Sequence, residues 1–316
     1  MIEANLPWVE SPFFYDILKT KELSDAQIKI ATEFHEQGYA VISNVLPVEL
    51  IDKVQHETEH IGFNTTIPLK IPRDTHRVQD LWLEAEAVRN LACYPTLLET
   101  LEMLYDRKPV PFQTLNFKFG TQQRAHSDAI HFSSLPARFM CGVWVALEDI
   151  TPENGALFYY PKSHKLQEYN FSHFRSDIRN PSYENYPEYE DFIAQIMTRY
   201  GFEKQHFYAK KGDVLIWSSN ITHGGSKVTD ENSTRWSQVT HYFFQDCIYY
   251  TPMLSNMVTN ELYMRNNLTD ITTGKIIQQS YNGHHIKKIR LKGSRSILNN
   301  NIKIAPKLLR FVGKIL

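Results

Sequence analysis

The stretch NFKFGTQQRAHSDAIHF, residues 116–132, decides how the fold and function of this chain are predicted. It opens with β-rich residues and then places His126 two positions before Asp128, a spacing found at only one of the 13 histidines. Side chains i and i+2 of a strand point to the same face, so a strand here would present an imidazole nitrogen and a carboxylate oxygen to one cation. A His-x-Asp pair also arises by chance, and the pair alone is weak evidence for a metal site.

A second segment, KKGDVLIWSSNITHGGS at residues 210–226, adds a third candidate ligand. A Gly-Asp turn leads into an apolar strand, and His223 follows the strand just before two glycines. Two histidines and one carboxylate form the facial triad of non-haem iron(II) oxygenases, which leaves coordination positions open. A zinc hydrolase can use the same ligands, so His126, Asp128 and His223 predict a metal site without fixing the reaction.

Arg235 lies twelve residues after His223, at the start of RWSQVTHYFF. Strand alternation would place Arg235 on the same face as Ser237 and Val239. If that face lines a cavity, the guanidinium can form a bidentate pair with a carboxylate, such as the distal carboxylate of 2-oxoglutarate. Taken alone, an arginine on a strand is more often a surface residue.

The texture around these segments predicts the fold class. Short β-rich runs separated by turn residues follow Pro111: FQTLNFKFG, FMCGVWVALED, ALFYYPKSH, DVLIWSS and RWSQVTHYFFQ. Strands at this spacing are typical of a β-sandwich or barrel-like jelly roll. Ahead of them, the pattern predicts helices at 24–37 and 48–61, a strand at 39–46, and mostly helix at 81–104. We therefore expect an α+β protein with a mainly β core and N-terminal flanking helices.

Two segments depart from this pattern. Residues 166–207 are too long for a turn and rich in aromatic and polar residues, which predicts a lid-like insertion with helix near 188–200. Residues 284–316 carry nine basic and no acidic residues, and APKLLRFVGKIL predicts a short basic amphipathic helix. Such a helix docks on its own domain or a twin subunit, or contacts a membrane surface or partner. We divide the chain into a domain, 1–283, and this tail.

Composition narrows the class of protein. Of the 316 residues, 42% are hydrophobic and 22% charged, as in ordinary globular proteins. No apolar run reaches 18 residues, the N-terminus lacks a secretory pattern, and three scattered cysteines suit a reducing cytoplasm. The tail contains nine of the 34 basic residues, so residues 1–283 contain 25 basic residues and all 35 acidic residues. The body of the protein is therefore acidic, which makes nucleic acid a poor candidate partner.

Taken together, the segments resemble the phytanoyl-CoA dioxygenase family of iron(II)/2-oxoglutarate oxygenases. The similar pieces occur in the family's order over roughly residues 35–245: GYAVISNVLPVELID, HSD, VWVALEDITPENGALFYYPKSHK, KGDVLIWSSNITHGGS and Arg235. In ENGALFYYPKSHK, Lys162 stands where the family usually has glycine. No single piece is specific, but the ordered set is.

The resemblance implies a double-stranded β-helix (cupin-like) core that binds Fe(II) through His126, Asp128 and His223 and uses 2-oxoglutarate and O2. It also implies that Arg235 holds the far carboxylate of 2-oxoglutarate. Two further positions match family positions that contact this cosubstrate or line its pocket, Gln123 and Trp144. We expect inward-facing side chains on the preceding strand at Thr114, Asn116 and Lys118. We treat His131 and His164 as neighbours of the site, not as ligands.

The same resemblance bears on the reaction and the substrate. Halogenating relatives lack the carboxylate, so Asp128 favours hydroxylation, or a related desaturation or ring closure. The aromatic and polar residues of 166–207 suit a small polar or amphipathic substrate, and sugar-linked, acyl-CoA and secondary-metabolite substrates stay open. Lys70, Arg73 and Arg77 bind an anion or are solvated surface charges. The alternatives are a non-catalytic binding module on this fold, or a cupin-type metal-dependent hydrolase or isomerase.

Overall fold

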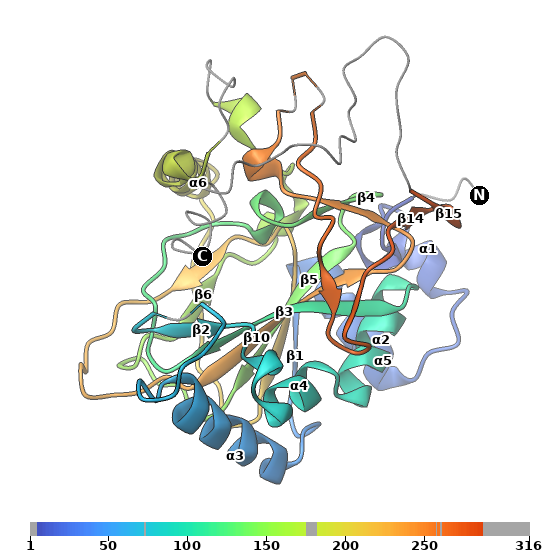
Figure 1. The fold of residues 1–316 in the computed structure, drawn as a ribbon. Coiled ribbons are helices and arrows are strands. Elements are labelled where there is room, and N and C mark those ends of the chain that lie inside the picture. Colours follow the sequence, from blue (N-terminus) through green and yellow to red (C-terminus); the bar gives the residue numbers. More distant parts are fainter. Residues whose placement is uncertain (1–4, 73, 175–181, 257, 260, 287–316) are drawn as a thin grey trace.

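The computed structural model of the chain describes residues 5–72, 74–174, 182–256, 258–259 and 261–286. Its centre is a six-stranded antiparallel sheet with helices along one side, and a separate helix, α6, lies away from them (Figure 1). Arg73 and the predicted basic helix at 305–316 lie outside the described residues. Among the described residues, no helix has both the length and the apolar character needed to cross a bilayer.

The large sheet has the strand order β1-β8-β5-β10-β3-β2, and every neighbouring pair is antiparallel. Its bounds are β1 (Tyr39–Ile42), β8 (Val214–Ser218), β5 (Met140–Ala146), β10 (Ser237–Phe244), β3 (Pro109–Phe117) and β2 (Arg77–Gln79). The five β-rich runs predicted from the sequence all contain strands of this sheet or of the smaller one.

A smaller sheet has the order β7-β6-β9, with β7 (Gln205–Phe207), β6 (Leu157–Tyr159) and β9 (His223–Gly225). Three two-stranded pieces complete the β structure: β4 (Ser133–Leu135) with β11 (Ile248–Tyr250), β12 (Thr269–Asp270) with β13 (Lys275–Ile276), and β14 (Ser280–Tyr281) with β15 (His284–His285). Strands of the large and small sheets line one cavity between them, which is the arrangement of a jelly roll.

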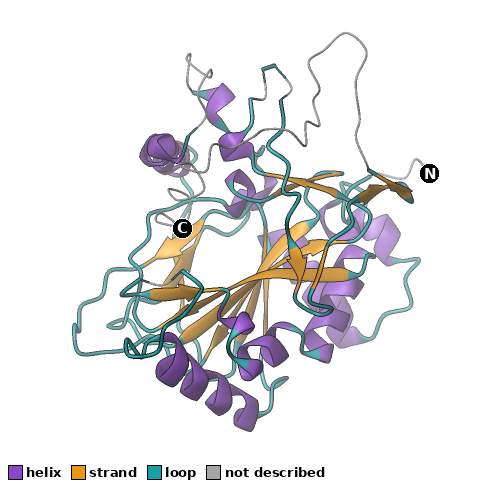
Figure 2. Cartoon of the chain, in the orientation of Figure 1, coloured by secondary structure: helices purple, strands orange, loops and turns teal. Residues whose placement is uncertain are grey.

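Except for α6, the α-helices all come before β3 in sequence, with β1 and β2 of the large sheet lying between them along the chain (Figure 2). They are α1 (Phe14–Leu18), α2 (Asp25–Gln37), α3 (Val48–Glu57), α4 (Glu86–Ala92), α5 (Pro95–Tyr105) and α6 (Tyr186–Arg199). A π-helical turn extends α3 over Thr58–Gly62, and a 3-10 turn at Asp128–Ile130 lies beside the cavity. The helices predicted at 24–37, 48–61, 81–104 and 188–200 are therefore all present.

Helix α2 shows how local sequence sets these boundaries. Ser24 caps the helix in a capping box with Gln27, which satisfies two backbone N–H groups that the first turn would leave free. Gly38 ends the helix at φ +86°, a left-handed conformation that glycine adopts without the strain of a Cβ atom. The chain then enters β1 directly, so the helix is fixed against one edge of the large sheet.

The large sheet is buried on both faces, which is why its strands read as continuous apolar runs. One face packs under the helices and carries Val143, Val145, Val214 and Ile216. The other face points between the two sheets and carries the residues Phe117, Trp144, Leu215, Trp217 and Val239. The cavity opens within this second layer, so the helical layer supports the sheet from behind.

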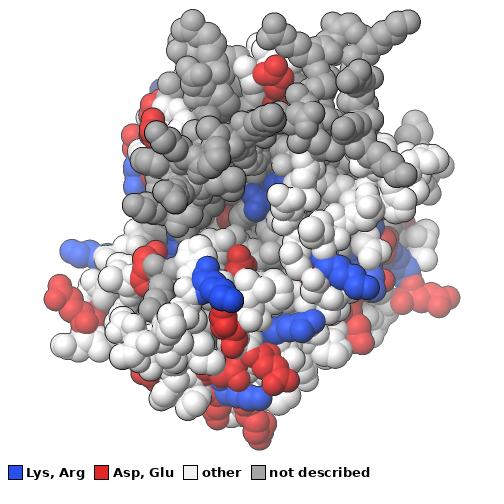
Figure 3. Space-filling view, in the orientation of Figure 1, with Lys and Arg blue, Asp and Glu red and all other residues white. Residues whose placement is uncertain are grey.

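Lys, Arg, Asp and Glu side chains are interspersed on the face shown in Figure 3, and acidic side chains gather at its lower end. No continuous basic stripe crosses the described part of that face.

Candidate metal centre

The cavity between the two sheets is lined by side chains from both of them. Its empty space, counting the open mouth, is about 740 Å³. From the large sheet it takes inward residues of β3, β5, β8 and β10, and from the smaller sheet residues of β6 and β9. Each of the six site residues predicted from the sequence lines it: Gln123, His126, Asp128, Trp144, His223 and Arg235.

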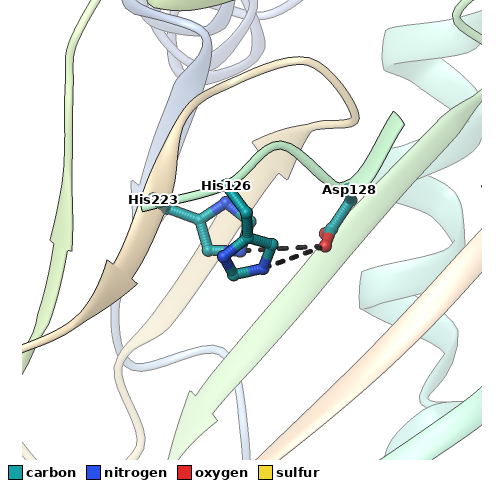
Figure 4. A group of neighbouring side chains, drawn as sticks. All are labelled: His126, Asp128 and His223. Atoms are coloured by element: carbon teal, nitrogen blue, oxygen red, sulfur yellow. Dashed lines mark ion pairs between the residues drawn. The ribbon is translucent and has the colours of Figure 1, made fainter. Parts of the chain in front are cut away.

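His126, Asp128 and His223 form one buried group whose potential ligand atoms all lie within 4.8 Å of one another. Asp128 Oδ1 is 3.7 Å from His126 Nε2 and 3.8 Å from His223 Nε2 (Figure 4). Two atoms that each lie about 2.1 Å from a metal ion are at most about 4.2 Å apart, so both distances fit one shared cation. Within the described residues, no other group of His, Cys, Asp or Glu has this geometry.

The outer oxygen of Asp128 is occupied by protein groups. Trp217 Nε1 donates a 2.8 Å hydrogen bond to Asp128 Oδ2, and His241 Nε2 lies 3.6 Å from the same oxygen. His241 is itself held by a 3.0 Å hydrogen bond between its Nδ1 and Gln113 Oε1. The carboxylate is therefore oriented with Oδ1 toward the two histidines, as supporting groups orient a metal ligand.

The two histidines are fixed through their far nitrogens. His126 Nδ1 lies 2.9 Å from the Arg124 carbonyl, and His223 Nδ1 lies 3.1 Å from the Ile221 carbonyl. A carbonyl only accepts, so each Nδ1 carries the proton and each Nε2 keeps its lone pair. Both Nε2 atoms face Asp128, and this is the tautomer that a metal ion requires.

Burial and charge favour these protonation states. Burial, followed by the nearby His223, lowers the pKa of His126 to about 4, so its imidazole is neutral at physiological pH. Burial opposes ionisation of Asp128, but His223, His241 and His126 together outweigh it and hold the pKa of this carboxyl well below its usual range. A neutral imidazole and a carboxylate are the forms that bind metal.

The backbone at the site differs from the predicted strand. His126 makes a single bridge to His223, with hydrogen bonds of 3.0 and 2.9 Å in the two directions, and Asp128 begins a 3-10 turn. The expectation that strand alternation aligns His126 and Asp128 was therefore wrong. Ser127, capping the turn, accepts the N–H of Ala129 and so bends the chain at this point. The turn, together with the Trp217 contact, directs the carboxylate back toward both imidazoles.

Arg235 lies just before β10 and is 2% exposed. Its Nε and Nη1 atoms are buried without a hydrogen-bond partner among the described residues. Glu148, an acid whose charge acts on Arg235, accepts hydrogen bonds from the Trp236 N–H and the Thr234 hydroxyl. Burial lowers the pKa of Arg235 to about 10, so it stays charged at neutral pH. A buried cation with open donors calls for an anionic partner.

Aromatic rings enclose this end of the cavity. The Arg235 guanidinium lies 5.5 Å from the ring of Phe117 and 5.9 Å from that of Trp144. Trp144 Nε1 is also buried without a partner among the described residues. Trp144 and Arg235 therefore both offer unpaired donors at the place where the sequence predicted a carboxylate. Gln123 lies at the other end, with Nε2 3.3 Å from His126 Nε2.

The predicted inward face of β3 was wrong by one residue. Gln113, Leu115 and Phe117 line the cavity, whereas Thr114 and Asn116 lie on the opposite face. Asn116 donates to Thr58 and to Gln238 beneath the helical layer, and these buried bonds hold it there. Lys118, past the strand end, lies within 4.0 Å of Glu59 and over the ring of Trp236, outside the cavity.

His131 and His164 differ in their position relative to the cavity. His164 packs against Gly38, with Nε2 3.1 Å from the His35 carbonyl, and takes no part in the cavity. His131 lines the cavity but is not in the metal group. Sequence reasoning missed Trp217 and His241. Extending the alternation of Arg235, Ser237 and Val239 by one step would have found His241.

The jelly-roll cavity with a buried His-Asp-His group and a buried arginine defines the class of cupin-like metal-dependent oxygenases. The chain belongs to the phytanoyl-CoA dioxygenase family, whose model, described as "Phytanoyl-CoA dioxygenase (PhyH)", matches residues 34–235. The predicted family is thus confirmed.

Curated relatives have low sequence identity to this chain. The chain is 22% identical over 241 residues to the human peroxisomal phytanoyl-CoA dioxygenase, covering 68% of each chain. It is 27% identical over 111 residues to a probable phytanoyl-CoA dioxygenase of Caenorhabditis elegans, covering 34% of this chain and 32% of that protein.

Solved structures share the fold. The non-haem alpha-ketoglutarate-dependent epimerase SnoN from nogalamycin biosynthesis is 17% identical with a TM-score of 0.55, covering 71% of this chain and 85% of SnoN. EctD from S. alaskensis, solved with 2-oxoglutarate and 5-hydroxyectoine, is 16% identical with a TM-score of 0.56, covering 77% and 84%. These likenesses confirm the predicted jelly-roll core. The protein is an iron- and 2-oxoglutarate-dependent dioxygenase acting on a small molecule. Its family membership and the chemistry of the His-Asp-His group both support this activity.

Proposed function

We propose that His126, Asp128 and His223 bind the catalytic Fe(II), that Arg235 binds the distal carboxylate of 2-oxoglutarate, and that the enzyme hydroxylates a small polar or amphipathic substrate. The observation that carries this proposal is the buried Arg235 with unpaired nitrogens in the same cavity as the His-Asp-His group. A hydrolase using these ligands would have no use for a second, buried cationic site. When bound, the iron supplies the oxidising chemistry with O2 and 2-oxoglutarate.

The protein's own residues position the reactants. Trp217 and His241 direct one oxygen of Asp128 toward the histidines, and backbone carbonyls fix the imidazole tautomers. Arg235 orients 2-oxoglutarate from its far end, with Trp144 donating beside it and Gln123 near the metal ligands. Leu115, Phe117 and Val239 exclude water around the chain of the cosubstrate.

We propose that residues 166–207 act as a lid. Tyr186, the first residue of α6, lies with its ring 6.5 Å from that of His126 and 4.9 Å from that of His131. Arg124, whose carbonyl holds His126, forms ion pairs with Glu190 and Asp191 of α6. The helix is therefore tied to the segment that carries the metal ligands. Opening and closing of such a segment commonly controls substrate entry.

We keep the division into a domain, residues 1–283, and a basic tail as a proposal, noting that the β14–β15 hairpin crosses this boundary. The tail contacts a membrane surface or a partner in this proposal. Interspersed charges on the face in Figure 3 support a small-molecule enzyme without a nucleic-acid partner. The three cysteines are unpaired, which supports a cytoplasmic location.

The test is succinate release from 2-oxoglutarate by the full chain, with and without added Fe(II), in the absence of substrate. Wild type should release succinate slowly and only with iron and O2. His126→Ala and Asp128→Ala should reduce this to background and lose iron binding, whereas the exposed His206→Ala should behave as wild type. Iron-independent succinate release would rule out the assigned ligands. Iron and 2-oxoglutarate binding without any turnover would favour the binding-module alternative.

A further inference from the structure

A second arginine opens onto the same cavity from the edge of the large sheet. Arg77 is the first residue of β2 and pairs in register with Phe117 of β3. Cross-strand partners share a face, so Arg77 points to the side on which Phe117 lines the cavity, and it lines the cavity itself. Its side chain is 21% exposed, whereas Arg235 is 2% exposed, which places Arg77 nearer the open mouth.

The charge of Arg77 is incompletely matched. Asp74 Oδ2 lies 3.5 Å from Arg77 Nε, but that nitrogen is buried and forms no hydrogen bond to the described residues. Half of the Asp74 side chain faces solvent, so it is a weak partner. Burial also lowers the pKa of Arg77, so the environment penalises its charge more than Asp74 compensates it. A planar donor group is thus available at the mouth.

Polar groups from two other elements lie around it. The Nδ1 atom of His131 is buried without a hydrogen bond to the described residues, and His131 lines the cavity. The Tyr186 hydroxyl is buried beside Gln123 without a well-formed hydrogen bond, and it lies close enough to Arg77 to interact with its charge. Buried polar groups normally have partners, so open donors on separate elements indicate a ligand that supplies them.

This ligand differs from 2-oxoglutarate. Arg235 lies beside Trp144, whereas Arg77 lies toward Tyr186, which contacts the rings of His126 and His131. The two arginines therefore have different neighbours in the cavity, although both lie beside Phe117. A single 2-oxoglutarate molecule bound at the metal and at Arg235 would leave Arg77 without an anionic partner from the cosubstrate.

We infer that the substrate carries an anionic oxygen group, a carboxylate or a phosphate, that Arg77 binds at the mouth of the cavity, with His131 and Tyr186 as hydrogen-bonding neighbours. This inference rests on the proposed function, because it takes the cavity as an oxygenase active site. The Arg77 guanidinium matches a carboxylate or phosphate through two parallel N–H bonds. Arg77 therefore determines specificity, because it contacts the substrate at a group remote from the carbon that is oxidised.

The experiment measures binding of three probes to the full chain saturated with Zn(II) and 2-oxoglutarate, so that the Arg235 end is filled and no turnover occurs. The probes are 3-phenylpropionate, phenyl phosphate and the neutral 3-phenylpropionamide. Wild type should bind one of the anions about tenfold more tightly than the amide. Whichever anion binds more tightly identifies the group as carboxylate or phosphate.

The Arg77→Gln variant should reduce this preference to about twofold or less, and Arg77→Lys should keep only part of it. Lys210→Gln, at an exposed cation paired with Asp149, should keep the full preference. All variants should show the wild-type melting temperature. Equal binding of amide and anions by wild type, no anion binding, or an unchanged preference in Arg77→Gln would each overturn the inference.

Failure of the inference is distinguishable from failure of the proposed function. Uncoupled succinate release with Fe(II) measures the function without any probe, and the 2-oxoglutarate requirement of Arg77→Gln decides whether Arg77 binds the substrate or the cosubstrate. A marked rise in that requirement would place Arg77 at the cosubstrate and overturn the inference while leaving the oxygenase assignment intact.

Discussion

The two ends of the cavity satisfy their polar groups in opposite ways. At the metal end, protein groups engage the outer oxygen of Asp128 and the far nitrogens of His126 and His223, and the atoms left over converge on one point. At the other end, the Nε and Nη1 atoms of Arg235 are buried and have no hydrogen-bond partner among the described residues. The protein preorganises the metal end, whereas we propose that bound 2-oxoglutarate completes the arginine end.

This difference predicts that the two ends respond to different kinds of substitution. Supporting residues should matter most at the metal end, because the ligands depend on them for orientation. At the arginine end the single residue should matter most, because its buried, unpaired nitrogens are the donors that we propose bind 2-oxoglutarate. The following substitutions separate these expectations.

The largest effect is expected at Arg235. Arg235→Gln removes the buried charge that we propose pairs with 2-oxoglutarate. Such a pair is worth about 3 kcal/mol, so the 2-oxoglutarate KM should rise on the order of 100-fold. The Fe(II) requirement should stay near that of wild type. The measurement is succinate release while each of the two is varied in turn. An equal response to iron and 2-oxoglutarate would remove the distinction between the two ends.

A smaller effect is expected at Trp217. Trp217→Phe keeps the ring and removes the hydrogen bond to Asp128 Oδ2, which should weaken metal binding about tenfold. The 2-oxoglutarate KM at saturating metal should change little. Titration of the apo chain with Fe(II) or Zn(II) measures this. Gly142→Ala should act in the same direction, because an added Cβ would lie 2.3 Å from the Trp217 ring.

His164 provides a control for the histidines of the metal end. Burial lowers its pKa to about 3 although it lies outside the cavity. The folded chain holds His164 neutral, whereas the unfolded chain protonates it below about pH 6.5, so its stabilising contribution is full above that pH and lost on acidification. Between pH 6.5 and 5, this is about 2 kcal/mol.

His164→Gln should therefore flatten the fall in unfolding free energy over this pH range, measured by urea denaturation at each pH. Its absolute stability will differ from that of wild type, so the comparison concerns the slope. An unchanged slope would show that other groups, including the ligand histidines, control acid unfolding.

The smallest effect is expected at Lys162, which does not line the cavity. It adopts φ +69° at the position where the family usually has glycine, and its N–H bonds the Gln37 carbonyl. The left-handed conformation costs a residue with a Cβ about 1 kcal/mol. Lys162→Gly should thus stabilise the chain by up to about 1 kcal/mol without altering 2-oxoglutarate or metal binding. Thermal unfolding measures the gain, and a loss of stability would contradict it.

The sequence was sufficient to predict the parts of the site that have a recognisable spacing. His126, Asp128, His223 and Arg235 belong to an ordered set of motifs, and strong local signals such as the Ser24 capping box define the helices. The strands of the large sheet were predictable because both faces are buried, which gives unbroken apolar runs.

Features that depend on contacts between distant segments were not predictable. The inward face of β3 depends on Asn116 bonding to Thr58 and Gln238, partners that alternation cannot reveal. The support of Asp128 by Trp217 depends on Gly142 leaving room for the indole ring. The sequence alone could not distinguish whether Arg77 binds an anion or is a solvated surface charge. The pairing of β2 with β3, which places Arg77 opposite Phe117, is what turns it toward the cavity.

The paired backbone hydrogen bonds between His126 and His223 have a consequence for folding. They close a long loop of chain, and the entropy of that closure must be offset before both imidazoles face one point. Metal affinity then reports on the folded population, because the unfolded chain keeps the two ligands apart. Iron at a hundred times its dissociation constant would stabilise the fold by about 2.7 kcal/mol. Iron supply would therefore govern how much of this protein survives in a cell, and not only how fast it works.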